Sequence, residues 1–296
     1  AEYQNGGINV STDGGNSFND ATNGIDFNDR RHWDMQYIMS KADPNRMYTG
    51  TYQVYRNDDG ENANWYSISS DITDGVIYGD RFHTISCVEE SPANDNNLYA
   101  GTTDGNVWAS TNQGTTWQNV TGVLPDRYVS SVKASVLNAN TVFVTHTGYK
   151  YNDFIPHIHK SINNGNTWVD ISGNLPPAAI NDVYVTAAGD DVLFVATDAG
   201  VYATVDGGVT WNRLGNNMPI IPVYDLDFDY SSNRLCAATF ARSMMTYDVD
   251  SIVSLGTPAV SELPSLSLYP NPAINYLQIK LPFTNDVTIT IYDVKG

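Results

Sequence analysis

The amino-acid sequence predicts an all-β protein assembled from repeated antiparallel units. Two observations indicate this class: the residue composition and a short segment that recurs along the chain. The 296 residues are 41% apolar and 11% aromatic, with 19 Tyr and 6 Trp, and such residues favour sheet surfaces over helix bundles. Gly and Asn are frequent, whereas long runs of Ala, Leu, Glu and Lys are missing. Composition therefore favours many short strands joined by tight turns.

Four short segments align with one another without gaps, and this internal repetition decides the architecture. Each segment reads Ser/Thr-x-Asp/Asn-x-Gly-x-x-aromatic, with Ser or Thr directly before the aromatic residue. The copies are STDGGNSF at 11–18, STNQGTTW at 110–117, SINNGNTW at 161–168 and TVDGGVTW at 204–211. A fifth and looser copy, RNDDGENANW at 56–65, carries a small insertion.

The repeated segment has the chemistry of a tight turn. We expect the Asp or Asn side chain to accept hydrogen bonds from backbone amides just ahead of it, Gly to adopt a positive φ, and the Ser or Thr hydroxyl to reinforce the turn. The closing Trp or Phe begins the next strand and is expected to pack its ring under the hairpin. These turn residues are Ser11, Asp13, Gly15, Phe18, Asp58, Gly60, Trp65, Ser110, Asn112, Gly114, Trp117, Ser161, Asn163, Gly165, Trp168, Thr204, Asp206, Gly208 and Trp211.

The residues around each repeat predict a unit of four short antiparallel strands. An alternating strand such as HTISCVEESP comes first, and an apolar strand, a Gly or Thr turn and a further strand then lead into the repeat. Four-stranded units in series are the blades of a β-propeller. We therefore expect a propeller over 1–250 with about six to seven blades. Five units are nearly complete, and residues 1–22 supply the end of one more.

The last unit stops after its third strand and lacks the repeat. In propellers of this kind the missing outer strand usually comes from the start of the chain, but here the start already belongs to a different unit. Either the ring closes in another way or upstream sequence is missing. We expect an incomplete propeller in a fragment of a longer protein.

The repeated turn resembles the Asp box, or BNR repeat, of sialidases, sortilins and xyloglucan-cleaving hydrolases. Three longer stretches resemble blades of sortilin-type and xyloglucanase-type propellers, namely WDMQYIMSKADPNRMYTGTYQVYRNDDG, HTGYKYNDFIPHIHKSINNGNTWVDISGNLP and MPIIPVYDLDFDYSSNRLCAATFARSMMTYD. The resemblance covers roughly 30–250 and implies the fold. It does not imply an activity, because propellers host many functions.

The end of the chain resembles a different family. Residues 251–265 read as a Ser/Pro linker, and LSLYPNPAINYLQIKLPFTNDVTITIYDVKG then resembles the C-terminal sorting domain of the type IX secretion system of Bacteroidota. The opening motif is Tyr269, Pro270, Asn271 and Pro272, and the strands LQIKLP and VTITIYDVKG follow it. That domain is a small β-sandwich roughly twice this long, so 266–296 is expected to be its N-terminal part. The resemblance implies export by the type IX secretion machinery, then release or anchoring at the cell surface.

The net charge of −18 argues against two classes of partner. Fifteen basic and 33 acidic residues repel phosphate backbones and anionic lipid, so neither nucleic acid nor a membrane surface is an expected partner. No run of 18 apolar residues occurs, so no membrane-inserting segment is expected. No signal peptide precedes Ala1, and we interpret this position as a mature or trimmed start.

The two cysteines lie in apolar, strand-like runs, ISCV and RLCAA. An exported protein permits a disulfide between Cys87 and Cys236. The two residues nevertheless fall in distant repeats, and a buried free cysteine is ordinary in a protein core. Two free thiols are therefore the preferred interpretation.

Glycoside hydrolysis would need two carboxylates across a cleft, roughly 6.5–9.5 Å apart in inverting enzymes and closer in retaining ones. Asp34, Asp80 and Asp182 fall near strand starts or in inter-blade loops, where propeller sites usually form. No motif singles out a pair among them, and we expect solvated loop acids. A sialidase would need an arginine cluster and an Arg-Ile-Pro segment. The arginines are scattered and Arg-Ile-Pro does not occur, so sialidase activity is rejected.

Three histidines of the long hairpin, His146, His157 and His159, lie on partner strands and could in principle bind zinc. No Cys or carboxylate spacing supports such a site, so a polar hairpin face is the preferred interpretation.

Three carboxylates share one face of the strand-like run 225–229, where calcium is conceivable. Acids facing solvent, with the intervening apolar residues facing the core, are the preferred interpretation. We expect no metal and no cofactor, with structural calcium as the alternative. These carboxylates are Asp225, Asp227 and Asp229.

Six aromatic residues fall in loops or hairpin tips, where exposed rings can stack on sugars or dock a protein. The hairpin at 147–157 is longer than its counterparts, so it should project as a contact element. The six candidate ligand-binding residues are Trp33, Tyr52, Tyr78, Tyr149, Tyr151 and Phe154.

Two functions follow from these observations. The first is a secreted or cell-surface, non-catalytic propeller module that binds a protein or a glycan, as part of a larger exported protein or surface assembly. The alternative is a xyloglucanase-like glycoside hydrolase acting on extracellular polysaccharide. Family resemblance alone motivates the hydrolase.

Overall fold

The computed structural model describes residues 1–76, 83–215, 218–229, 231–232 and 234–252 with their side chains. Residues 77, 81–82, 267–269 and 278–280 are described by their backbone alone. The chain divides into two compact units, Ala1–Gly256 and Thr257–Gly296. Across the described residues, no helix combines the length and apolar character needed to span a membrane. Five residues of the sequence predictions lie outside the described residues, namely Tyr78, Asp80, Pro270, Asn271 and Pro272.

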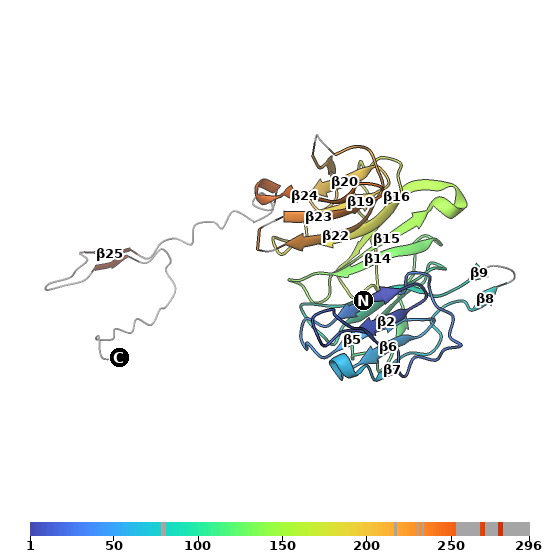
Figure 1. Ribbon diagram of the computed structural model, residues 1–296. Coiled ribbons are helices and arrows are strands. Elements are labelled where there is room, and N and C mark those ends of the chain that lie inside the picture. Colours follow the sequence, from blue (N-terminus) through green and yellow to red (C-terminus); the bar gives the residue numbers. More distant parts are fainter. Residues whose placement is uncertain are drawn as a thin grey trace. The chain divides into compact units, whose positions relative to one another are not determined.

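The first unit consists of antiparallel sheets that follow one another along the chain (Figure 1). In four of them, four strands lie side by side in chain order. The first is β4 (Tyr37–Met39), β5 (Met47–Gly50), β6 (Val54–Asn57) and β7 (Trp65–Ser67). The second is β10 (Ile85–Glu90), β11 (Leu98–Thr102), β12 (Val107–Ser110) and β13 (Gln118–Asn119). The third is β14 (Tyr128–Ala134), β15 (Val142–Gly148), β16 (Asp153–Ser161) and β17 (Val169–Asp170), and the fourth is β18 (Ile180–Val185), β19 (Leu193–Thr197), β20 (Gly200–Thr204) and β21 (Asn212–Arg213).

Three-stranded sheets stand before and after these four. The earlier one contains β1 (Glu2–Tyr3), β2 (Gly7–Val10) and β3 (Asn19–Asp20), and the later one contains β22 (Val223–Asp229), β23 (Arg234–Thr239) and β24 (Ser243–Asp248). A two-stranded ribbon of β8 (Val76–Ile77) and β9 (Arg81–Phe82) extends the link between β7 and β10. In the second unit, β25 (Ser267–Tyr269) pairs with β26 (Gln278–Lys280).

These six sheets confirm the predicted succession of propeller blades. The start of the chain forms its own sheet, and β24 has no fourth-strand partner among the described residues. Strand pairing therefore does not close a ring within the described part of the chain, in agreement with the prediction of an incomplete propeller.

Alternating strand direction places the turns of each sheet at two opposite ends. The turn between the second and third strands lies at one end with the link to the next sheet, and we call this end the connection face. The first turn and the repeated turn lie at the other end, the repeat-turn face. Backbone hydrogen bonds join the two turns of that face: Gln113 N donates to Asn96 O at 2.9 Å, Asn164 N to Asn140 O at 2.9 Å, and Gly207 N to Asp191 O at 3.1 Å.

The four repeated turns share one hydrogen-bond pattern. In the copy that follows β12, Ser110 Oγ accepts from the Gly114 amide at 2.9 Å, and Asn112 Oδ1 accepts from the Thr116 amide at 2.9 Å. The equivalent bonds of the other copies measure 2.8–3.0 Å and 2.9 Å. The glycine that the four repeats share has φ between +83° and +94°, a conformation that disfavours any side chain.

The looser fifth copy is offset by one residue from the predicted alignment. Asn57 Oδ1, rather than Asp58, accepts from the backbone amides of this turn, at 2.9 Å from Asp59 N and 3.2 Å from Asn64 N. Asp58 instead forms an ion pair with Arg56, whose guanidinium nitrogen lies 2.8 Å away. The insertion, which folds as the 3-10 helix η1 (Gly60–Asn62), shifts the register, so the predicted turn role of Asp58 is wrong.

The closing tryptophans join each sheet to the sheet before it. Each indole Nε1 donates to a backbone carbonyl that follows the last strand of the preceding sheet. The pairs are Trp65 with Ala21 O at 2.8 Å, Trp117 with Ile68 O at 2.9 Å, Trp168 with Val120 O at 2.7 Å, and Trp211 with Ile171 O at 2.9 Å. The rings therefore lie between sheets, and the N–H group is satisfied where it is buried.

Phe18 is the exception among the closing aromatic residues. Its side chain is 53% exposed, so the prediction that this ring packs under a hairpin is wrong. Its sheet is the first one described, so no preceding sheet in the described chain covers the ring.

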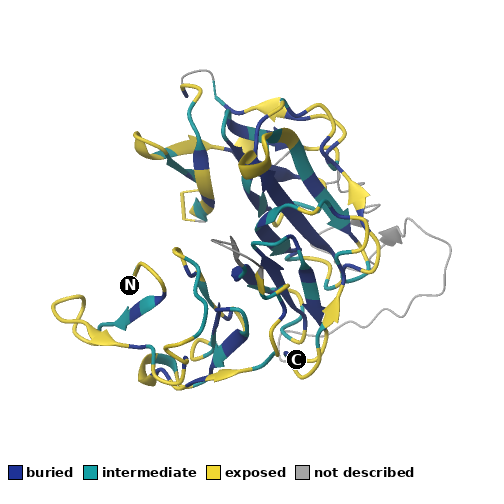
Figure 2. Ribbon diagram, turned by 90° about the vertical axis from the view of Figure 1, so that its right-hand side faces the viewer, coloured by how far each residue is buried: buried dark blue, intermediate teal, exposed yellow. Residues whose placement is uncertain are grey.

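Hydrophobic cores lie between neighbouring sheets rather than at one common centre. Five clusters of buried side chains each combine residues of two successive sheets. Figure 2 shows buried residues along the inner strands and exposed residues in the turns. Cys87 is buried in one cluster, and both Cys87 and Cys236 are free, which confirms the prediction of two thiols.

We predict that Trp211→Ala destabilises the first unit by about 3–5 kcal/mol, because it opens a cavity between two sheets and leaves the Ile171 carbonyl without its donor. Urea unfolding followed by fluorescence and circular dichroism measures the change. Phe18→Ala is the matched control in the same repeat position, and it should cost about 1 kcal/mol or less because the ring is exposed. Equal losses of stability for Trp211→Ala and Phe18→Ala would contradict the conclusion that the closing tryptophan holds two sheets together.

Candidate functional site

The first strands of successive sheets line two adjoining cavities. A cavity of about 450 Å³ is bordered by Asp34 just before β4, Lys133 on β14, Asp182 on β18 and Asp225 on β22. A second cavity of about 530 Å³ is lined by Glu89 and again by Lys133. Lys133 therefore stands between the two cavities.

Lys133 is the one basic residue bordering the smaller cavity in the described chain. The charges of Asp182, Glu89 and Asp225 raise the pKa of Lys133, although burial opposes that change. Burial in turn raises the pKa values of Asp182 and Glu89, and the lysine partly offsets this increase. A single cation thus balances several carboxylates, of which Asp182 is buried, Glu89 is half-buried and Asp225 is exposed.

The three predicted catalytic aspartates have different environments. Asp182 is buried inside β18, where its Oδ2 accepts from the Leu226 amide at 3.0 Å, so the expectation of a solvated loop acid is wrong for this residue. A register shift between Ile180 and Asp182 marks a bulge directly before this residue. Asp34 is exposed but borders the same cavity, and Asp80 lies outside the described residues.

Four of the six predicted aromatic residues are exposed at the connection face. Their exposed fractions are 66% for Trp33, 55% for Tyr149, 55% for Tyr151 and 48% for Phe154. We call these four residues the aromatic patch. Tyr52 is half-buried with the Arg30 guanidinium 4.3 Å from its ring centroid, and Tyr78 lies outside the described residues.

The long hairpin that carries three of these rings is formed by β15, the 3-10 helix η2 (Tyr149–Tyr151) and β16 (Figure 1). The Arg127 guanidinium lies 4.9 Å from the Tyr151 ring centroid, and its Nε donates to Asp153 at 3.0 Å. The Lys150 ammonium lies 6.0 Å from the Tyr149 ring centroid. Each of these two cations therefore lies near one exposed ring, and Arg127 also joins the ring of Tyr151 to the start of β16.

A contact across sheets ties this hairpin region to the segment that carries Trp33. His32 Nε2 lies 3.3 Å from the Tyr128 hydroxyl, and the Tyr128 ring centroid lies 5.7 Å from the Lys150 ammonium. Contacts through Tyr128 therefore link the segment that carries Trp33 to the hairpin that carries the other three rings.

The hairpin histidines are not among the converging ligand groups found in the described residues. His146 is fully buried, which differs from the predicted polar face, and burial lowers its pKa well below the usual value. Its ring packs edge-on against His159, with 6.1 Å between the centroids. Neither ring nitrogen of His146 has a hydrogen-bond partner among the described residues.

The aspartates of β22 likewise form no converging ligand group within the described part of the chain. Asp225, Asp227 and Asp229 face solvent on alternate positions, as predicted, and Asp229 accepts hydrogen bonds from Ser231 and Ser232. Hydrogen bonds from the Ser231 and Ser232 side chains lower the pKa of Asp229 to about 2.

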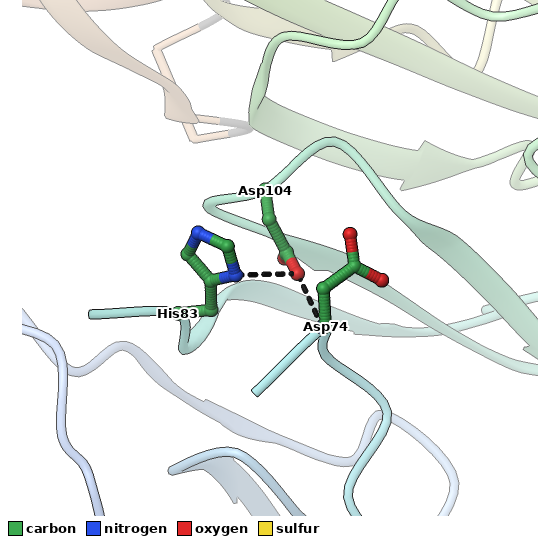
Figure 3. A group of neighbouring side chains, drawn as sticks. All are labelled: Asp74, His83 and Asp104. Carbon is green, nitrogen blue, oxygen red and sulfur yellow. Dashed lines mark hydrogen bonds and ion pairs between the residues drawn. The ribbon is translucent and has the colours of Figure 1, made fainter. Parts of the chain in front are cut away.

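Sequence inspection missed one group of side chains at the connection face. Asp74, His83 and Asp104 place one ligand atom each within 4.8 Å of the others, the one such group found in the described residues (Figure 3). They come from the link between β7 and β10 and from the turn between β11 and β12, so no short motif unites them.

Comparison with solved structures identifies the fold of the first unit. The GH74 xyloglucanase from Xanthomonas campestris has a TM-score of 0.54 at 17% identity, over 72% of this chain and 36% of that chain. An ancestral GH74 enzyme has a TM-score of 0.52 at 19% identity, over 69% of this chain and 27% of that chain. YCF48 from Cyanidioschyzon merolae has a TM-score of 0.57 at 16% identity, over 80% of this chain and 75% of that chain.

These similarities confirm the β-propeller fold and, at such identities, only the fold. The chain spans 27% and 36% of the lengths of the two GH74 enzymes. In all, 903 solved chains match, so the fold by itself selects no activity. No curated protein matches the chain in sequence.

A family comparison identifies the end of the chain. Residues 267–296 match the family described as a secretion system C-terminal sorting domain, which confirms the resemblance carried by the motif at Tyr269. The sorting domain of the type IX system directs proteins out of the cell, so this protein is secreted or held at the outer cell surface.

We predict that Lys133→Met costs about 1–3 kcal/mol at pH 7, because it removes the one cation that borders the cavity near the carboxylates of Glu89 and Asp182. Their pKa values are already raised, so their protonated forms favour the folded state. The loss should therefore shrink as the pH falls from 7 toward 5. Urea unfolding at both pH values measures it.

Lys160→Met provides the control for this prediction. Lys160 pairs at 3.3 Å with Asp191, whose side chain is 69% exposed, and such a surface pair contributes about 1 kcal/mol or less. A loss of stability for Lys133→Met that does not change with pH would contradict the role assigned to Lys133.

Proposed function

We propose that the chain is an exported, non-catalytic β-propeller module that binds an extracellular glycan or protein through the aromatic patch. The observation that supports this most strongly is the exposure of four large rings at one end of the sheets. Exposed apolar groups gathered on one face of a soluble protein are typical of an interaction site. Arg127, which is bonded to Asp153, restrains the Tyr151 ring, and this lowers the conformational entropy lost on binding.

The chemistry of the patch suits a ligand with both apolar and polar groups. Tyr149 and Tyr151 offer flat faces for stacking and hydroxyl groups at their edges. Trp33 adds the largest ring from a second segment, so a bound ligand can bridge two loops. A sugar chain or an extended peptide has this combination of properties.

The acids around Lys133 are explained better by charge balance within the fold than by catalysis. Asp182 accepts a backbone hydrogen bond and faces Lys133, so its carboxylate is already engaged. An acid in such a position contributes to the packing of neighbouring first strands.

A glycoside hydrolase is the second candidate, because Asp34 and Asp182 border one cavity and burial raises the pKa of Asp182. A raised pKa is a property of a general acid in glycoside hydrolysis. Release of reducing sugar from xyloglucan and other polysaccharides, abolished by Asp182→Asn and by Asp34→Asn, would support this candidate. If no polysaccharide tested released reducing sugar, the hydrolase candidate would be excluded.

We further propose assignments for the remaining parts of the chain. The four repeated turns are Asp boxes of the BNR and sortilin-like type, with a structural role only. Residues 1–250 form the propeller, 251–265 a linker and 266–296 the N-terminal part of the sorting domain. The type IX secretion machinery would be the partner of that last part during export.

We predict that Tyr149→Ala with Tyr151→Ala weakens ligand binding about tenfold to 100-fold, since exposed aromatic anchors carry a large share of binding energy. Trp33→Ala should cause a similar loss from the second segment. Glycan arrays and surface-plasmon measurements with purified extracellular polysaccharides test whether the ligand is a glycan. Affinity capture with isolated surface proteins tests whether it is a protein.

Phe18→Ala is the control for this experiment. Phe18 is 53% exposed but lies on the repeat-turn face, so its loss should leave binding unchanged. Unaltered affinity after loss of Tyr149, Tyr151 and Trp33, in variants with parental thermal stability, would contradict the assignment of the aromatic patch.

A further inference from the structure

Asp74, His83 and Asp104 form a compact group where the link between two blades meets the next blade. Asp74 precedes β8, His83 follows β9, and Asp104 lies in the turn between β11 and β12 (Figure 3). His83 Nδ1 lies 3.2 Å from Asp104 Oδ2, and the Asp74 backbone amide donates to the same oxygen at 2.5 Å. One imidazole nitrogen and two carboxylates therefore face a common point.

Backbone pairing fixes this geometry. Thr103 N donates to Thr84 O at 2.9 Å, and Thr84 N donates to Thr103 Oγ1 at 3.1 Å. These residues directly follow His83 and directly precede Asp104, so the two side chains are held opposite each other. Such preorganisation is what a ligand set requires.

Asp104 has unused bonding capacity in a buried position. Its side chain is 3% exposed, and its Oδ1 is buried without a hydrogen-bond partner. His83 Nδ1 lies near Asp104 Oδ2 as an ion pair but likewise makes no hydrogen bond. Among the described residues, no Lys or Arg forms an ion pair with Asp74 or Asp104. A buried carboxylate in this condition is costly unless a cation completes it.

A second layer of polar contact orients the carboxylates. Asn106 Nδ2 donates to Asp74 Oδ1 at 3.1 Å and lies 3.4 Å from Asp104 Oδ2. A side-chain amide that donates hydrogen bonds to the ligating carboxylates, and so fixes their orientation, is typical of metal sites.

We propose that Asp74, His83 and Asp104 bind a divalent transition metal, with Zn²⁺ as the best fit. Imidazole nitrogen with carboxylate oxygen is a ligand set that Zn²⁺ accepts, and three protein ligands leave a fourth tetrahedral position for water or an external ligand. Ca²⁺ requires six to eight oxygen ligands and seldom takes imidazole, so it fits this group poorly. The bound metal ties the link that contains β8 and β9 to the turn of the following blade, a role independent of ligand binding at the aromatic patch.

The test uses the full chain, freed of metal by dialysis against a chelator, with Zn²⁺, Ca²⁺ and Mg²⁺ as probes. Isothermal titration should show one equivalent of Zn²⁺ bound at micromolar or tighter affinity, with a rise in melting temperature, and no comparable response to Ca²⁺ or Mg²⁺. Co²⁺ should give visible absorption bands of a low-symmetry nitrogen and oxygen site.

Asp104→Asn and His83→Gln should weaken Zn²⁺ binding by about 100-fold or more, since loss of a direct ligand exceeds the 10-fold to 100-fold cost of losing an outer contact. Asp74→Asn tests the third ligand at an exposed position, where the substitution does not threaten folding. His157→Gln is the matched control, because His157 also pairs with an aspartate, Asp153 at 3.3 Å, but has no third ligand.

Zn²⁺ affinity that is unchanged in Asp74→Asn and in His83→Gln would overturn the proposal, as would absence of stoichiometric Zn²⁺ binding to the parental chain. Loss of Zn²⁺ binding in His157→Gln with retention in His83→Gln would place the metal elsewhere and would equally overturn it.

Discussion

The hydrogen bond from each closing tryptophan to the sheet before it is the contact on which the propeller unit depends. A single twisted sheet of short strands cannot bury both of its faces, so its stability comes from its neighbours. The indole N–H lies at the boundary between two sheets and reaches a carbonyl at the end of the preceding outer strand, as Trp168 does at 2.7 Å from Val120 O. A shift of one sheet against the next would bury the N–H without a partner, so this bond sets the register of the stack.

The glycines of the repeated turns also allow neighbouring sheets to pack closely. A Cβ added to Gly165 would lie 2.7 Å from the Val120 side chain, and one added to Gly208 would lie 2.4 Å from Ile171 O. The glycine thus meets two requirements at once, a positive φ and close approach to the preceding sheet. Gly15, whose sheet follows no other described sheet, would place its Cβ in open space. The repeated turn is therefore a device for docking blades, and its exposed outer residues carry no evident chemistry.

The sequence predicted what depends on local, repeated chemistry. Turn hydroxyls, glycines and tryptophans recur at fixed spacing, so the blades and the order of their strands follow from the pattern. Asp182 was expected in a solvated loop, but β18 already begins at Ile180 and the next sheet covers the carboxylate, which local sequence cannot reveal. The fifth turn was misaligned by one residue because an insertion changed which side chain reaches the amides. The group at His83 escaped detection because Asp74 and Asp104 meet it only through the pairing of Thr84 with Thr103.

The division between the two faces explains where functional chemistry is found in this molecule. The repeated turns and their closing tryptophans take part in blade docking, so every copy must satisfy the same contacts. The connection face has no such obligation, so its turns differ in length, from the two residues between β19 and β20 to the η2 segment of the long hairpin. The aromatic patch, the Asp74 group and the cross-sheet contact of His32 with Tyr128 all belong to this unconstrained face.

The acids around Lys133 lie between these faces on the first strands, where charge balance limits their freedom to take part in chemistry. The rigid docking of the blades thus allows the opposite face to vary, and recognition is expected to reside there.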